Sequence, residues 1–148
     1  MAPEVRRNLA AFLQGEVYAV LSSVASNGTP QSALVGVVVN DRFEVFFDTL
    51  ASSRKATNLR SAPAIAFVFG STDSTSIRTV QYEGTADEPS GDELDELLER
   101  YFDRFPDGGE RRSAGGIAYF RAKPAWIRFS DYSVAPPLIA EFRESDLV

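Results

Sequence analysis

Two segments of the chain carry apolar residues at the spacing of an α-helix. Over residues 3–14 the apolar positions fall on one helical face, and they are Val5, Leu9, Phe12 and Leu13. Over 90–105 a longer stripe consists of Leu94, Leu97, Leu98, Tyr101, Phe102 and Phe105. Ser90, with Glu93 three residues later, is typical of a helix start. The pattern predicts two amphipathic helices.

Most of the remaining chain alternates apolar and polar residues or runs apolar in short blocks, as β-strands do. Asn27-Gly28 between the first two blocks is a strong hairpin signal, so these two strands should pair antiparallel. The third block is rich in aromatic residues, which predicts burial of both its faces. The expected strands cover 16–25, 31–39, 43–49, 64–69, 77–86, 117–122 and 125–130.

Three stretches lack either period and are expected to be loops or loose ends. They are 70–76, 107–116 with its two Gly-Gly pairs, and the tail after Pro136-Pro137. About seven antiparallel strands with three helices predict an α+β fold whose sheet closes, or nearly closes, into a barrel. A chain of 148 residues has the size of one ordinary domain, so we expect a single domain over 1–148.

A short helix after the third strand begins with an unusual group of polar residues. Its start is Ser52-Ser53-Arg54-Lys55, and Pro63 ends it. A helix N-terminus carries free N–H groups and partial positive charge, so two adjacent cations there favour the binding of an anion such as phosphate. Alternatively, Arg54 and Lys55 extend into solvent, since a misplaced surface cation costs only about 0.3–1 kcal/mol.

The composition of the chain narrows the chemistry that it can carry out. The formal net charge of −6 argues against a nucleic-acid or anionic-membrane partner, because both need a basic face. The absence of His and Cys removes the commonest general base, the thiolate nucleophile and the usual metal ligands, so any catalysis should depend on an organic cofactor. No signal-peptide pattern and no apolar run of about 20 residues is present, so we expect a soluble, cytoplasmic protein.

Three stretches of the sequence resemble the pyridoxamine 5′-phosphate oxidase-like split-barrel flavoproteins. They are 46–56, which is similar to the phosphate-binding stretch of that family, 28–33 after the hairpin turn, and 80–86 on the fifth strand. Their order and spacing match over about 9–131. The resemblance implies an antiparallel split β-barrel of about six to seven strands with three flanking helices. It also implies FMN as cofactor, a small-molecule substrate, and a homodimer with the cofactor at the subunit interface.

The resemblance assigns roles to individual residues. Arg54 and Lys55 would pair with the FMN phosphate, and the hydroxyls of Ser53 and Thr49 would bind the phosphate or the ribityl chain. The edge of the flavin ring would contact Ala33, Leu34, Val35 and Asp48, mostly through their backbone groups. The side-chain amide of Gln81 would also contact the ring.

Several of these positions have a purely structural alternative. Ala33 and Val35 are also what the interior of a barrel would contain, and Gln81 on a strand is equally a solvent-facing residue. Trp126 and Arg128 share a face of the strand that, in the family, approaches the flavin of the partner subunit. The sole Trp is more often a core residue, and we expect core packing for Trp126.

The sequence departs from the family at the substrate site. Ala33 and Val38 stand where authentic pyridoxamine phosphate oxidases carry basic residues, and the C-terminal Arg-x-His motif is missing. We therefore reject a vitamin B6 substrate and expect an FMN-binding oxidoreductase that transfers hydride through flavin N5. Two alternatives stay open. One is a deazaflavin-dependent reductase, whose longer anionic tail would use Arg60, Arg111 and Arg112. The other is a flavin-binding or flavin-free module for sensing, storage or stress response, without turnover.

Overall fold

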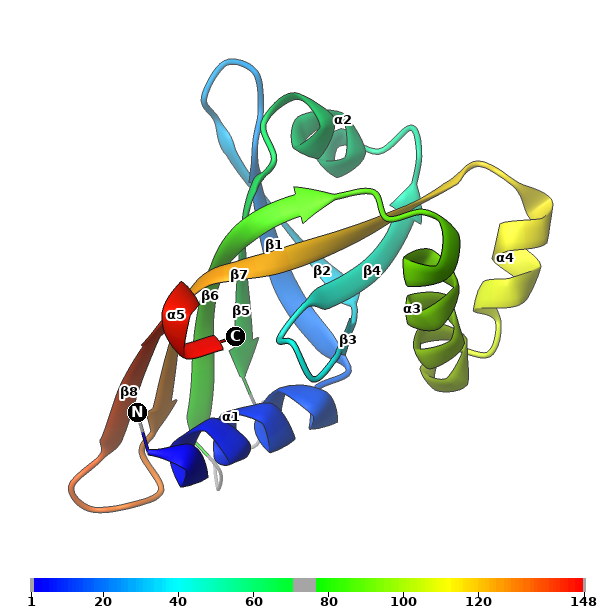
Figure 1. Cartoon of the computed structure of the whole chain (residues 1–148). Coiled ribbons are helices and arrows are strands. Elements are labelled where there is room, and N and C mark those ends of the chain that lie inside the picture. The colour runs from blue at the N-terminus through cyan, green and yellow to red at the C-terminus, as the bar shows by residue number, and fades with distance from the viewer. Residues whose placement is uncertain (1, 71–76, 148) are drawn as a thin grey trace.

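The chain forms one antiparallel sheet of eight strands with five helices around it in the computed structural model, which describes residues 2–70 and 77–147 (Figure 1). The helices are α1 (Pro3–Gly15), α2 (Arg54–Ser61), α3 (Gly91–Arg104), α4 (Gly108–Ala114) and α5 (Glu144–Leu147). The strands are β1 (Tyr18–Val24), β2 (Pro30–Gly36), β3 (Val38–Val39), β4 (Val45–Leu50), β5 (Ala64–Gly70), β6 (Arg78–Asp87), β7 (Ile117–Asp131) and β8 (Leu138–Arg143). The expected loop over 70–76 falls on 71–76, outside the described residues.

The sheet runs in the order β2-β1-β5-β6-β7-β4-β3, with β8 beside β7. It is strongly curled, so β2 at one edge comes into contact with β4 near the other. Helix α1 crosses one end of the curled sheet, and α2 lies at the opposite end beside the tip of the β1–β2 hairpin (Figure 1). The fold is an α+β split barrel, which confirms the fold class that the sequence predicts.

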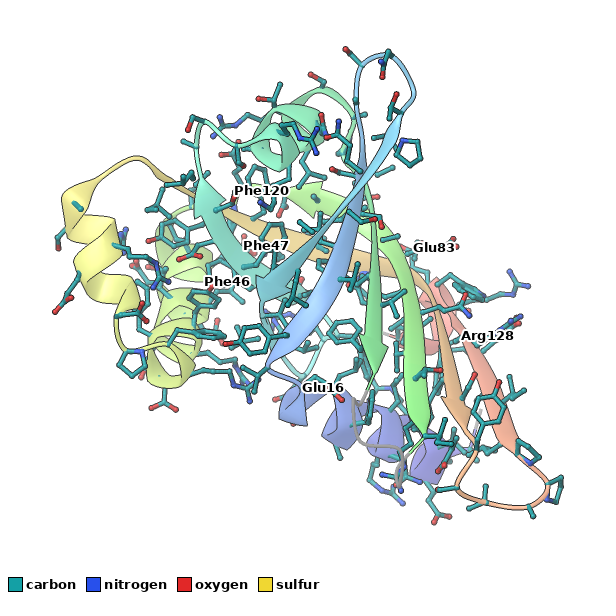
Figure 2. The ribbon with its side chains drawn as sticks, turned by 180° about the vertical axis from the view of Figure 1, so that it is seen from behind. Glu16, Phe46, Phe47, Glu83, Phe120 and Arg128 are labelled. Atoms are coloured by element: carbon teal, nitrogen blue, oxygen red, sulfur yellow. The ribbon has the colours of Figure 1, made fainter. Side chains whose placement is uncertain are left out.

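Alternate residues of the strands fill the interior of the barrel. The largest of them, each at most 2% exposed, are Phe47, Phe67, Phe69, Tyr82, Phe120, Phe129 and Phe142. Phe46 points away from this core and packs against Tyr101 of α3, with ring centroids 5.4 Å apart. Figure 2 shows Phe46 on the side of α3, and Phe47 beside Phe120. Strand β4 is therefore buried on both faces, as its aromatic run predicts.

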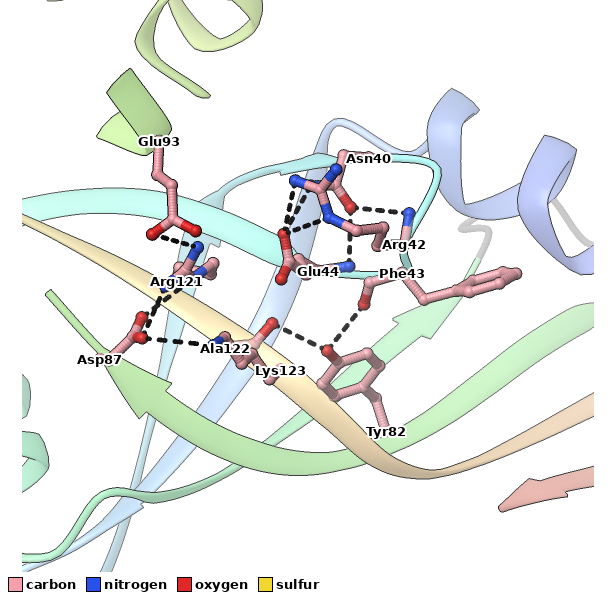
Figure 3. Close-up of polar contacts among 10 residues, drawn as sticks. All are labelled: Asn40, Arg42, Phe43, Glu44, Tyr82, Asp87, Glu93, Arg121, Ala122 and Lys123. Carbon is pink, nitrogen blue, oxygen red and sulfur yellow. Dashed lines mark hydrogen bonds and ion pairs between the residues drawn. The ribbon is translucent and has the colours of Figure 1, made fainter. Parts of the chain in front are cut away.

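The side chain of Tyr82 ties β6 to β7 and to the start of β4 (Figure 3). Its hydroxyl lies 2.8 Å from the carbonyl oxygen of Phe43 and 3.1 Å from that of Ala122. Burial raises the pKa of Tyr82 well above its usual value, so the hydroxyl remains a donor at neutral pH. Before β4, the side-chain oxygen of Asn40 accepts the backbone N–H of Glu44 at 3.0 Å. These contacts fix the entry of β4, the strand that leads to α2.

Four segments differ from the expected secondary structure, and the first is the strand expected over 31–39, which is divided into β2 and β3. The expected loop over 107–116 contains α4, and the tail beyond Pro137 forms β8 and α5. The two strands expected over 117–122 and 125–130 are one strand, β7. A register shift in β6 between Glu83 and Gly84 accommodates Pro124, which has no N–H to donate to the sheet. Gly84 is required there, because a Cβ would lie 2.3 Å from the carbonyl oxygen of Lys123.

Two individual residues also differ from expectation. Ser90 precedes α3 as predicted, but its side chain makes no capping hydrogen bond. Trp126 is not a core residue: it is half-buried on the outer face of β7, where the guanidinium of Arg128 lies 5.5 Å from the centre of its ring. The neighbouring positions Ile127 and Phe129 take the inward face instead.

Candidate functional site

Two hydroxyl groups hold the start of α2 directly after β4. Ser53 is the N-cap residue, and its Oγ accepts the backbone N–H of Ala56 at 3.2 Å. The hydroxyl of Thr49 donates to the same oxygen at 2.9 Å. Because this oxygen accepts both hydrogens, the hydroxyl hydrogen of Ser53 is left to donate, and it has no acceptor within residues 2–70 and 77–147.

The first turn of α2 carries concentrated positive charge. It contains Arg54 and Lys55 and no acidic residue. In the described part of the chain neither cation forms an ion pair, whereas Arg60 at the other end of the same helix pairs with Glu88 at 2.7 Å. Free backbone N–H groups and the helix dipole add partial positive charge at the same end. This turn is therefore suited to bind an anion.

A pocket of about 150 Å³ lies against this turn. It is lined by Arg54 and Lys55 of α2 together with residues of the hairpin, namely Leu21, Ser23, Gln31, Ser32 and Ala33. Pockets for drug-sized ligands usually measure about 300–1,000 Å³. This pocket therefore offers room for a phosphate group and its neighbouring atoms, but not for a fused ring system.

Asn58 fastens α2 to the hairpin beneath it. Its Nδ2 donates to Oγ of Ser23 at 3.0 Å and to Oε1 of Gln31 at 2.9 Å. Asn58 and Ser23 are only 6% and 2% exposed. Sequence reasoning missed these three residues. The one available signal was a polar residue directly before Leu59 on the buried face of α2.

The structure brings together five of the nine residues predicted for the site. Ala33, Arg54 and Lys55 line the pocket. Ser53 and Thr49 do not line it, but they hold the start of α2 beside it. The grouping supports a phosphate site formed by β4, α2 and the hairpin.

Three other predicted residues do not line the pocket either. Leu34 is 70% exposed on the outer face of β2, and Val35 is buried in the barrel. Gln81 is exposed on β6, and both β1 and β5 lie between that strand and β2. Within one chain, a ligand seated beside Arg54 is thus separated from Gln81 by the width of two strands.

Asp48 is the ninth predicted residue, and its side chain points to the face of β4 opposite Thr49. Its carboxylate accepts the hydroxyl of Tyr101 at 3.0 Å and pairs with Arg111 of α4 at 2.8 Å. Burial, together with the nearby charge of Asp48, raises the pKa of Tyr101. The carboxylate of Asp48 anchors α3 and α4, so only its backbone is left to meet a ligand on the pocket side.

A row of exposed side chains crosses the outer face of the sheet. From one strand to the next its members are Leu34, Val20, Val68, Gln81 and Arg128. The first three are apolar and 70%, 39% and 51% exposed. At the polar end Arg128 pairs with Glu141, and Figure 2 shows Arg128 and Glu83 extending away from the barrel. A contiguous apolar strip on β2, β1 and β5 is typical of an interaction surface.

Neither a cluster of metal ligands nor a membrane-spanning helix is found among the described residues. No group of three or more potential metal ligands among His, Cys, Asp and Glu occurs there. None of the helices in that part of the chain has the length and hydrophobicity that a membrane crossing requires.

Sequence comparison identifies one family. Residues 5–131 match the profile of the family described as Pyridoxamine 5'-phosphate oxidase. A comparison with curated protein sequences gives no significant match.

Solved structures with the same fold include proteins that bind different ligands. A pyridoxamine 5'-phosphate oxidase-related, FMN-binding protein of Nostoc punctiforme is 14% identical, with a TM-score of 0.71 over 97% of this chain and 92% of that chain. A heme-binding protein of Mycobacterium smegmatis is 15% identical, with a TM-score of 0.80 over 99% of this chain and 61% of that one. General Stress Protein 26 of Bacillus anthracis is 19% identical, with a TM-score of 0.69 over 95% and 98%. At these identities the likeness shows a shared fold.

Proposed function

Because the chain belongs to the pyridoxamine 5′-phosphate oxidase family, we propose that it is an FMN-binding oxidoreductase that holds the phosphate of FMN at the start of α2. The observation that carries the proposal is the pocket beside Arg54 and Lys55, where two unpaired cations of the described chain meet the N-terminus of a helix. Arg54 and Lys55 supply full charges, and Ser53 supplies a hydroxyl donor. Thr49 acts through Ser53, because its own hydrogen is used on Oγ of Ser53.

We propose that two copies of the chain complete the site. The pocket of one chain is too small for the flavin ring. Gln81 lies on the outer face of the sheet, in the same row as the exposed Leu34, Val20 and Val68. A second copy packed on this apolar strip would cover it and would bring Gln81 of one copy toward a ring held by the other. Ala33, Leu34, Val35 and the backbone of Asp48 remain the proposed ring contacts on the chain that holds the phosphate.

FMN fits the observed charges better than a deazaflavin coenzyme with a longer anionic tail. Such a tail would need further free cations near the pocket. Arg60 is engaged by Glu88, and Arg111 is engaged by Asp48 at 2.8 Å. The guanidinium of Arg112 lies 5.8 Å from the centre of the Tyr119 ring. Of the three arginines considered for the tail, two therefore already have carboxylate partners.

Flavin is also favoured over heme, although a structurally similar protein binds heme. The chain contains no His and no Cys, which are two of the side chains that commonly hold heme iron. It does contain a pocket whose charged side chains are both cations, which suits a phosphate ester.

The proposed chemistry divides between cofactor and protein. Bound FMN would supply hydride transfer at N5. The residues of this chain would bind the phosphate, orient the ring against the barrel and, in the dimer, exclude water from it. No side chain is assigned as general acid or base.

Titration with FMN tests the phosphate site. Replacing Arg54 and Lys55 together by Ala should weaken FMN binding by about a hundredfold or more, since each charge-assisted contact contributes about 1.5–3 kcal/mol. Quenching of flavin fluorescence reports the affinity. The control replaces the exposed Arg7 and Arg100 by Ala, which removes the same charge from α1 and α3 and should leave the affinity unchanged. Equal FMN affinity in the Arg54/Lys55 variant and the unmodified chain would refute the site.

Turnover is a separate measurement. FMN-loaded protein should oxidise NADH or NADPH when a quinone is present as acceptor, followed by the absorbance of the reduced nucleotide. Stoichiometric flavin without turnover on either donor would identify a binding module instead of an oxidoreductase.

A further inference from the structure

We infer that Asn58 is a positioning residue that fixes the polarity of the phosphate pocket, and that it turns Ser23 and Gln31 into two further hydrogen-bond donors for the anion. This inference rests on the proposed function, since it concerns the same pocket. It adds residues of the β1–β2 hairpin to a site that the sequence motif places on α2.

Both hydrogens of the Asn58 side-chain amide are engaged. A side-chain amide nitrogen carries two hydrogens. In Asn58 one of them goes to Oγ of Ser23 at 3.0 Å and the other to Oε1 of Gln31 at 2.9 Å. Asn58 is 6% exposed and does not line the pocket itself, so it acts on a ligand only through its two partners.

These two bonds decide what Ser23 and Gln31 present to the pocket that both of them line. Oγ of Ser23 already accepts a hydrogen, so the group left over is its O–H. Oε1 of Gln31 is likewise occupied, so its NH₂ group is the free end of the amide. Neither leftover donor has an acceptor among residues 2–70 and 77–147. An anion in the pocket, which both residues line, would supply acceptors for both donors.

The N-cap of α2, directly before the two cations, has a leftover donor of the same kind. Oγ of Ser53 accepts from Thr49 and from the backbone of Ala56, which leaves its hydrogen to donate. Two side-chain donors, from Ser23 and Gln31, and the two cations then line one small space whose lining contains no carboxylate. Such a site favours phosphate, which brings only acceptors when fully ionised, over an uncharged hydroxyl group at the same position.

Exchange of Asn58 for Asp reverses this polarity with almost no change in shape. A carboxylate has only acceptors, so it would take the hydrogen of Ser23 and the NH₂ group of Gln31 and would turn their oxygens toward the pocket. The matched control is Thr57→Asp, which adds the same charge one residue earlier on the exposed face of α2. Both variants are titrated with FMN and with riboflavin, which lacks the phosphate.

Relative to Thr57→Asp, Asn58→Asp should weaken FMN binding about tenfold or more and leave riboflavin binding unchanged. An equal loss of both ligands, or an effect no larger than that of Thr57→Asp, would overturn the inference while the FMN site stood.

A second variant without added charge tests the same inference in case Asn58→Asp does not fold. Gln31→Met keeps the length of a half-buried side chain and removes its donor. It should weaken FMN binding several-fold without changing riboflavin binding, and unchanged FMN affinity would remove Gln31 from the site.

Inorganic phosphate separates the two proposals from each other. It should raise the thermal unfolding midpoint of the unmodified chain, and it should raise that of Gln31→Met less. If this holds while FMN does not bind, the flavin assignment fails and the donor arrangement stands. If phosphate stabilises both chains equally, the donor arrangement fails.

Discussion

At the scale of single residues, the hydroxyl group of Ser53 has a structural task and, in the proposed site, a ligand-binding one. Its oxygen caps α2 by accepting the N–H of Ala56 and also accepts the hydroxyl of Thr49. Its hydrogen is not needed by either contact. The cap and a phosphate contact therefore do not compete for the same atom, which lets the helix start be stable both with and without a ligand.

Two substitutions of Ser53 should separate these tasks. Ser53→Ala removes the cap and should lower the free energy of unfolding by about 1 kcal/mol, measured by urea denaturation. Ser53→Asp restores a good cap and should recover that stability, but its carboxylate would face the bound phosphate. FMN binding should therefore be weaker in Ser53→Asp than in Ser53→Ala. If the Asp variant bound FMN as tightly as the unmodified chain, Ser53 would not face the phosphate.

Single residues also show which parts of the site can be predicted from neighbouring positions in the sequence. The polar start of α2 is predictable, because an N-cap and its neighbouring charges lie within a few positions of one another. Asn58 was missed because its partners Ser23 and Gln31 lie 35 and 27 positions away. Their contact exists only once the hairpin folds over the helix.

At the scale of elements, α4 depends on a contact from outside its own sequence. The paired glycines around it predict a loop, and its own seven residues could not form a stable isolated helix. Arg111 of α4 pairs with Asp48 of β4 and also with Asp107. The hydrogen bond with Asp48 raises the pKa of Arg111, so this cation stays charged throughout the accessible pH range. Tertiary contact therefore overrides the local propensity.

Arg111→Gln should release α4 from the sheet. Loss of the ion pair leaves Asp48 with Tyr101 as its remaining side-chain partner, so we expect a loss of about 1–3 kcal/mol in the free energy of unfolding. Hydrogen exchange should be faster in the backbone amides of α4. The control is Arg112→Gln, whose arginine has no carboxylate partner in the described chain. Equal effects of the two variants would show that the Asp48 pair does not hold α4.

The strands show the same limit of prediction. The first hairpin was predictable, because Asn27-Gly28 and the alternation beside it are local signals. Pro124 suggested a break that the structure does not have, because β7 passes through it opposite the irregularity at Glu83 and Gly84. A proline ends a strand or sits in a bulge according to the strand beside it, and that neighbour is not visible in the local pattern.

At the scale of the whole molecule, the curled sheet leaves one face without a cover. Helices α1, α3 and α4 and the barrel interior bury most large apolar side chains, yet Leu34, Val20 and Val68 stay exposed in one row. The pocket beside α2 is also smaller than a flavin requires. A homodimer through this face would account for both features.

Leu34→Lys should test that assembly. A lysine at this position would place a charge in the apolar strip of each copy, and the cost of burying it should dissociate the dimer. Sedimentation velocity should show a monomer, with weakened FMN binding. Val134→Lys adds the same charge at another exposed apolar position, in the connection between β7 and β8, and should leave the dimer intact. A monomeric unmodified chain that still binds FMN would exclude the shared site.

The most direct measurement is the affinity of the unmodified chain for FMN relative to riboflavin. The two ligands share the ring and the ribityl chain, so their difference isolates what the start of α2 does for the phosphate. We predict that FMN binds about a hundredfold or more tightly than riboflavin, and that inorganic phosphate competes with FMN but not with riboflavin. Equal affinities for the two flavins would contradict the account.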